Sequence, residues 1–114
     1  MNEITVENIN DILKYYNYFH DGIFKGINYN VIKGEVEVIM HIVSIEDRIV
    51  DANIKLLFTG CSDVSIKRIE SFDFIEKAYL KFINYKEKES ICFAEEINDP
   101  LIYIVADKLF YEEI

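Results

Sequence analysis

The segment that decides the fold reads Glu35-Val36-Glu37-Val38-Ile39-Met40-His41-Ile42-Val43-Ser44-Ile45. Apolar and polar residues alternate along it, with Val36, Val38, Met40 and Ile42 on one side and Glu35, Glu37 and His41 on the other. Successive side chains of a β-strand point to opposite faces, so this period of two predicts a half-buried strand. The run before it, 23–32, is rich in β-branched and aromatic residues, and Lys33-Gly34 is a turn signal. Together the two runs predict an antiparallel hairpin.

Further strands are predicted downstream by the same alternation. Residues 53–59 form one, with an inner face made of Ile54, Leu56 and Phe58. Gly60 marks a turn or bulge before a strand at 64–69. Residues 90–97 alternate as well, and the turn Asn98-Asp99-Pro100 leads into apolar strands at 101–106 and 109–112.

Residues 71–88 fit two structures. The spacing of Ile75, Ala78, Tyr79 and Phe82 suits an amphipathic helix, whereas the aromatic density and the alternation of Leu80 with Phe82 suit a strand. The stretch as a whole is left open between helix and strand, and a strand is favoured for 79–85.

The first eighteen residues predict a helix. Thr5 is expected as its N-cap, and apolar residues recur at helical spacing at Val6, Ile9, Leu13 and Tyr16. Asp21-Gly22 is a breaker that ends this segment.

Length and composition complete the fold prediction. A chain of 114 residues suits one domain, 1–114, because a single core serves about 100–150 residues. The fold class is mainly β (α+β): an antiparallel sheet or partly open barrel of about seven strands, with one N-terminal helix packed on it. No apolar run approaches the roughly 20 residues of a membrane span, and residues 1–5 do not open a signal peptide. We therefore expect a soluble, cytoplasmic protein.

The net charge limits the classes of partner that the protein is expected to bind. Twenty-one acidic and twelve basic residues give a formal net charge of −9. Nucleic acids and anionic membranes are bound through clustered cations, so the balance argues against both as partners. It favours a cationic protein, because complementary charge raises the rate of encounter.

The sequence shows no constellation typical of an enzyme. No serine lies in a GxSxG elbow, and no glycine-rich loop could cradle a phosphate. Cys61 and Cys92 lie far apart without the paired spacing of a zinc site, and we expect both to be reduced and structural. We accordingly predict a non-enzymatic protein with no catalytic residue, bound metal or cofactor.

The motif His20-Asp21-Gly22 has two interpretations. Adjacent side chains diverge on a strand or a helix, so His20 and Asp21 are not expected to serve one catalytic centre by themselves. The structural interpretation is that they cap the helix end and connect it to the first strand. A metal or general-base site would need further groups, such as His41.

Sixteen aromatic residues, eight Tyr and eight Phe, are a heavy aromatic content for this chain, and many of them must build the core. Tyr15, Tyr16 and Tyr18 lie on different sides of the predicted helix, so not all three can be buried equally. Exposed tyrosines are typical of binding hot spots, and we take Tyr15 and Tyr18 as candidates for contact with a partner.

The segment Tyr18-Phe19-His20-Asp21-Gly22-Ile23 resembles the FHD(S/G) opening of a set of small bacterial proteins, partly uncharacterised and partly classed as immunity proteins of polymorphic toxin systems. Later runs are similar to that set as well: Ile54-Lys55-Leu56-Leu57-Phe58-Thr59-Gly60-Cys61, Ile66-Lys67-Arg68-Ile69 and Ile102-Tyr103-Ile104-Val105-Ala106-Asp107. The resemblance spans about residues 15 to 112.

The resemblance implies a cytosolic inhibitor that binds and neutralises a cognate toxin domain. With the net charge, it suggests an acidic face that mimics phosphate to a basic toxin, and the candidates are Glu35, Glu37, Glu95 and Glu96. Two other classes stay open. One is an oligomeric domain, such as a homodimer, or a small-ligand-binding domain; the other is an enzyme or metal protein built on His20, Asp21 and His41.

Overall fold

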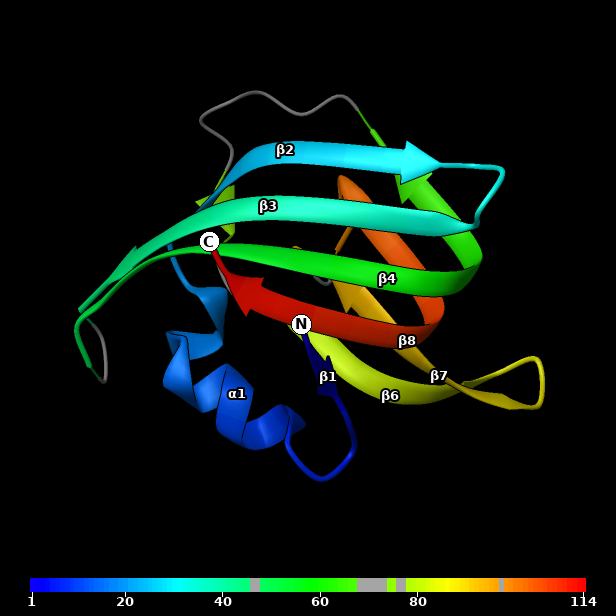
Figure 1. Ribbon diagram of the computed structural model, residues 1–114, viewed down its shortest axis with the longest axis horizontal. Helices are drawn as coiled ribbons and strands as arrows, with labels where there is room; N and C mark the ends of the chain where they lie inside the picture. The colour runs from blue at the N-terminus through cyan, green and yellow to red at the C-terminus, as the bar shows by residue number, and fades with distance from the viewer. Residues whose placement is uncertain (46–47, 68–73, 76–77, 97) are drawn as a thin grey trace.

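The alternating segments form one antiparallel sheet. The computed structural model describes residues 1–45, 48–67, 74–75, 78–96 and 98–114. Seven strands follow the order β5-β2-β3-β4-β8-β7-β6, and β1 pairs with β8 beside this path. Figure 1 shows the sheet curled around its core, with the helix α1 at one end. The predicted fold class, a mainly β antiparallel sheet with a short N-terminal helix, is confirmed.

The predicted hairpin consists of β2 (Gly22–Asn30) and β3 (Glu35–Ser44). The four alternating apolar residues of β3 are fully buried, and Val38 pairs with Leu56 of β4 (Val50–Ile66), which is buried too. The loop spans 31–34 rather than two residues, and Gly34 ends it with a φ of +65° that suits glycine. Burial of this one face holds the register of the hairpin, because a slip of one residue would expose it.

Two pairs of predicted strands are each one long strand. β4 continues through Gly60, so of the predicted turn or bulge at this glycine the bulge is confirmed, and β8 (Ile102–Glu113) continues through Asp107. The predicted division of each into two separate strands is wrong. Phe58 pairs with Leu109 and Cys61 with Ala106, which places Gly60 opposite Asp107. Gly60 has a φ of +62° and the pairing shifts just after it, between Cys61 and Asp63. The bulge changes the phase of the buried residues, so the sequence reads as two short strands.

The far side of the sheet contains β5 (Phe74–Ile75), β6 (Tyr79–Tyr85) and β7 (Lys88–Ala94). The strand favoured at 79–85 is confirmed, and its predicted first and last residues are those of β6. In β7 the predicted alternation fails, because Cys92 and Ala94 are buried along with Ile91 and Phe93. The remainder of the predicted strand 64–69, most of 71–78 and residue 97 lie outside the described residues.

The N-terminus differs from the prediction. Asn2–Ile4 forms β1, which pairs with Leu109–Tyr111 of β8, and α1 spans only Ile9–Tyr15. Asn8 occupies the N-cap position instead of Thr5, and its Oδ1 accepts a hydrogen bond from the Thr5 backbone N–H at 2.7 Å. Val6 precedes the helix and is exposed for that reason.

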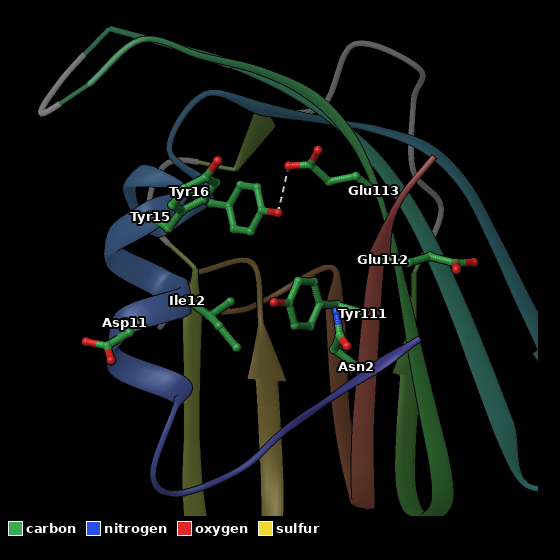
Figure 2. Close-up of a pocket in the computed structure, with 8 residues that line it drawn as sticks. All are labelled: Asn2, Asp11, Ile12, Tyr15, Tyr16, Tyr111, Glu112 and Glu113. Carbon is green, nitrogen blue, oxygen red and sulfur yellow. Dashed lines mark hydrogen bonds between the residues drawn. The ribbon is translucent and has the colours of Figure 1, made fainter.

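The helix packs against the open end of the curled sheet. Of its predicted apolar face, Ile9, Leu13 and, just past the end of the helix, Tyr16 are buried, and Ile12 is buried beside them. Among the described residues, no helix has both the length and the apolar character to cross a membrane. Because α1 lies across the end of the sheet, its inward side, with Ile12 and Tyr16, and the last residues of β8 face one another across a groove (Figure 2).

Candidate binding groove

A groove of about 490 Å³ lies between α1, β1 and the end of β8. It is lined by Asn2, Asp11, Ile12, Tyr15, Tyr16, Tyr111, Glu112 and Glu113. These lining residues include three carboxylates and three tyrosines but no lysine, arginine or histidine. Figure 2 shows that Tyr16, Tyr111 and Glu113 point into the space between helix and strand, whereas Asp11 and Glu112 point away from it.

The register of β8 explains why an acidic residue faces inward here. Tyr111 pairs with Leu56 and Glu113 with Ile54, and directly paired residues lie on the same face of a sheet. Leu56 and Ile54 are fully buried, so Tyr111 and Glu113 continue the inner face that Leu109 belongs to. The inner face of β8 thus changes from aliphatic to aromatic to acidic as it reaches the groove.

Tyr16 holds the Glu113 carboxylate in place. Its hydroxyl donates to Glu113 Oε1 at 2.7 Å, while its ring is only 5% exposed and meets the Tyr111 ring edge-on at 6.3 Å. Burial raises the pKa of the Tyr16 hydroxyl above its ordinary value, and the Glu113 carboxylate adds to this rise. The hydroxyl therefore stays protonated and remains a donor to the carboxylate at physiological pH.

Tyr15 connects the groove to the hairpin of β3 and β4. Its ring is 47% exposed, meets Tyr16 edge-on, and lies 3.8 Å from the guanidinium carbon of Arg48. The Asn17 side chain reinforces the connection, since its Nδ2 donates to Ser44 Oγ and to the Arg48 carbonyl. Beyond these contacts the tip of the hairpin exposes Val43, Ile45 and Ile49, the last two by 79% and 80%.

The motif His20-Asp21-Gly22 forms a tight connection to β2. Asp21 adopts a φ of +61°, which turns its side chain so that Oδ2 lies 3.2 Å from His20 Nδ1. The prediction that these adjacent side chains must diverge is therefore wrong, because it assumed regular helix or strand geometry. The Asp21 N–H donates to the Ile75 carbonyl, and a Cβ at Gly22 would lie 2.9 Å from the Phe19 carbonyl oxygen. These contacts fix the backbone of the motif against β5 and the residues that precede it.

The second histidine lies on β3, directly opposite Ile23 of β2, and its ring contacts residues of β4. His41 faces outward from β3, where its Nδ1 lies 2.7 Å from Asn53 Oδ1 and its Nε2 3.1 Å from Asp51 Oδ1. In the part of the chain that the structure describes, no three His, Cys, Asp or Glu residues are grouped so that they could hold a metal ion.

The four candidate glutamates do not share a face. Glu95 is 5% exposed and its Oε1 accepts a hydrogen bond from the Ile102 N–H at 2.9 Å, so its expected exposure is wrong. Glu37 lies on the outer face of β3, 3.9 Å from Lys55 Nζ, and Glu35 is half-buried at the start of the same strand. Glu96 is exposed, but it lies far from Glu37. The end of β7 pairs with Tyr103 of β8, whereas Glu37 is aligned, through Leu57 of β4, with Phe110, roughly 20 Å farther along β8.

Of the two tyrosines taken as candidates, Tyr15 lines the groove and Tyr18 does not. Tyr18 is 37% exposed and has a left-handed backbone, between Asn17 and Phe19. Its carbonyl accepts a hydrogen bond from the Ala78 N–H, so this residue also anchors the start of β6.

Sequence reasoning missed Tyr111 and Glu113. The signal was present as the alternation Leu109, Tyr111 and Glu113 in the last strand, which places all three on one face. The alternation does not reveal that α1 packs across the C-terminal end of β8. Searches of the sequence against protein-family models and against curated proteins find no match.

Proposed function

We propose that this protein is a non-enzymatic binding protein that captures a basic protein domain, in the manner of an immunity-type inhibitor that neutralises a toxin. The observation that carries the proposal is the contact of Arg48 with Tyr15, which brings the exposed residues of the hairpin tip next to the groove. We call the two together the α1-end surface, and it comprises Tyr15, Ile45, Ile49, Tyr111 and Glu113.

The composition of the α1-end surface supports a protein partner. Exposed aliphatic side chains at the hairpin tip lie next to an exposed tyrosine, and tyrosines dominate the energetic centre of many interfaces. Arg48 connects the tip to Tyr15, so the aliphatic and aromatic parts adjoin. The net charge of −9 favours encounter with a basic domain.

The experiment has two stages. The tagged protein captures its partner from a lysate of the source cells, the partner is eluted with rising salt, and mass spectrometry identifies it. The captured protein is then expressed in a test host with and without this chain. We expect growth arrest when it is expressed alone and restored growth on co-expression. A captured protein that is harmless, or whose toxicity is unchanged, contradicts the proposal.

The two hairpin tips of the molecule provide a matched control. Ile45→Ser with Ile49→Ser removes the aliphatic part of the α1-end surface, and Val31→Ser with Ile32→Ser makes the same change at the tip between β2 and β3. Both pairs are exposed, so neither double variant should unfold the protein. We expect only the first to weaken capture, by at least tenfold.

A small-ligand-binding domain is the second candidate function. The groove volume of about 490 Å³ lies within the range of small-molecule sites, roughly 300–1,000 Å³. A free organic cation that binds in the groove at micromolar concentration, together with no protein captured from the lysate, would favour this candidate.

A further inference from the structure

We propose that the groove receives an arginine side chain of the partner, with the guanidinium held between the Glu113 carboxylate and the tyrosine rings. This inference rests on the proposed function and names the anchor through which the α1-end surface recognises a basic domain.

The electrostatics of the groove select a positive group. Glu113 points into the groove, and none of the described residues that line it is basic. Tyr16 fixes the carboxylate through Oε1, at 2.7 Å, and a carboxylate has capacity for several donors in addition to this one. A guanidinium would add charge-assisted hydrogen bonds to a carboxylate that is already oriented.

The aromatic rings favour a guanidinium over an ammonium. Tyr15, Tyr16 and Tyr111 meet edge-on in succession around the groove, at 4.8 and 6.3 Å between ring centroids. An ammonium is also attracted to an aromatic face, but only a planar guanidinium stacks flat on it while its fork of donors binds a carboxylate through both oxygens. Arg48 makes such a contact with one face of the Tyr15 ring at 3.8 Å, so a partner's guanidinium would use the ring surface that Arg48 leaves open.

The surroundings of the groove favour a side chain over a free amine. The groove opens beside the aliphatic hairpin tip, where Ile45 and Ile49 are largely exposed. A free cation would leave these residues in water, whereas a protein that inserts an arginine here covers them in the same contact. The anchor and the apolar contact thus belong to one interface.

The test is a nuclear magnetic resonance titration with a capped tripeptide, acetyl-glycyl-arginyl-glycinamide. We expect saturable shifts confined to the resonances of Tyr15, Tyr16, Tyr111 and Glu113. The isosteric peptide with citrulline in place of arginine is neutral, and it should bind at least tenfold more weakly. The lysine peptide should bind more weakly than the arginine peptide, and spermidine no better than the lysine peptide.

Glu113→Gln removes the charge of the groove while its amide oxygen can still accept from Tyr16. We expect this variant to bind the arginine peptide at least tenfold more weakly than the wild type. Glu37→Gln is the matched control on the outer face, and its affinity should stay within twofold of the wild type. Unchanged amide spectra of both variants outside the mutated site would verify the fold.

Several results would overturn the inference. One is a set of shifts scattered over surface carboxylates and unaltered by Glu113→Gln; another is equal binding of the arginine and citrulline peptides. Tighter binding of spermidine than of the arginine peptide would assign the groove to a free amine. Each of these leaves the capture experiment unaffected, so failure of the anchor and failure of the inhibitor function can be told apart.

Discussion

The inner face of the sheet differs between its middle and its end at α1. In the middle, Leu56, Phe58 and Leu109 are fully buried and the Phe58 ring packs against Phe93 at 5.6 Å. At the end, the inner face of β8 continues with Tyr111 and Glu113, which face a groove, while Ile54, the partner of Glu113 on β4, stays buried. There the covering is a helix of seven residues instead of sheet.

This difference indicates that the middle of the sheet contributes mainly to stability and the end at α1 mainly to partner recognition. Burial of apolar side chains in the middle of the sheet supplies most of the driving force for folding. Tyr15 and Glu113 are exposed at the groove, so they add little to stability and are available for a partner, whereas Ile12 and Tyr16 beneath them are buried and belong to the core. Substitutions should therefore affect stability in the middle and binding at the end.

The largest effect expected is that of Phe58→Ala in the middle of the sheet. Removing a fully buried ring that packs against Phe93 should lower the free energy of unfolding by about 3–5 kcal/mol, measured by urea denaturation. Phe110→Ala is the matched control, because Phe110 is half-buried on the outer face of β8 and should cost about 1–2 kcal/mol. Equal costs would contradict the assignment of the core to the inner face.

Gly60→Ala should have the next largest effect, because β4 and β8 bend together at this glycine. A Cβ atom here requires an unfavourable positive φ and overlaps the Asp107 carboxylate, so we expect a loss of about 2 kcal/mol. Asp107→Ala removes the contacts with Oδ2 and Cγ but leaves its Cβ 2.9 Å from the new methyl group, so in that background the cost should fall only in part, to about 1.5 kcal/mol. A cost that is the same in both backgrounds would show that the backbone conformation alone accounts for it.

The bend at Gly60 also marks how far the sequence could predict the fold. Regular alternation predicted the hairpin of β2 and β3 and the inner face of β4 up to Phe58, because one buried face imposes a period of two. Past Gly60 the alternation changes phase on both paired strands, and two strands read as four. A single sequence does not show that the paired strand bends at the same place.

Prediction of the candidate site failed for a different physical reason. Tyr15 was predicted to be exposed from the helical spacing of its neighbours, and it lines the groove. Glu95 was predicted to be exposed because it is a carboxylate beside Glu96, whereas a tertiary hydrogen bond from the Ile102 backbone N–H compensates its burial. Tyr111 and Glu113 needed the position of α1 relative to β8, which depends on contacts between the two ends of the chain.

Tyr16→Phe tests the residue that lies between the buried core and the groove. The variant keeps the buried ring and loses the hydrogen bond to Glu113, so the free energy of unfolding should fall by about 1 kcal/mol. Tyr15→Phe is the control, since its exposed ring can remain against Arg48, and it should change stability by less than about 0.5 kcal/mol. A loss above about 3 kcal/mol for Tyr16→Phe would place this residue energetically in the core.

Glu95 should give the interior a pH dependence of stability. Burial raises its pKa above the ordinary value, so the folded protein takes up a proton at a higher pH than the unfolded chain. This group therefore stabilises the fold most below its unfolded pKa and loses that contribution as pH rises through the folded pKa. The wild type should gain stability relative to Glu95→Gln as the pH falls from 7 toward about 4.5. Parallel pH profiles would contradict the raised pKa.

The smallest effect on stability is expected for Glu113→Gln, and this variant defines the comparison most sharply. Glu113 is exposed at the end of β8, and glutamine can still accept from Tyr16, so the free energy of unfolding should stay within about 0.5 kcal/mol of the wild type. The same variant should lose affinity for the arginine peptide. Glu95→Gln should show the opposite pattern, with altered pH dependence of stability and unchanged peptide affinity. If Glu113→Gln destabilised the protein instead, the carboxylate would belong to the fold, and the groove would be one more packed end of the sheet.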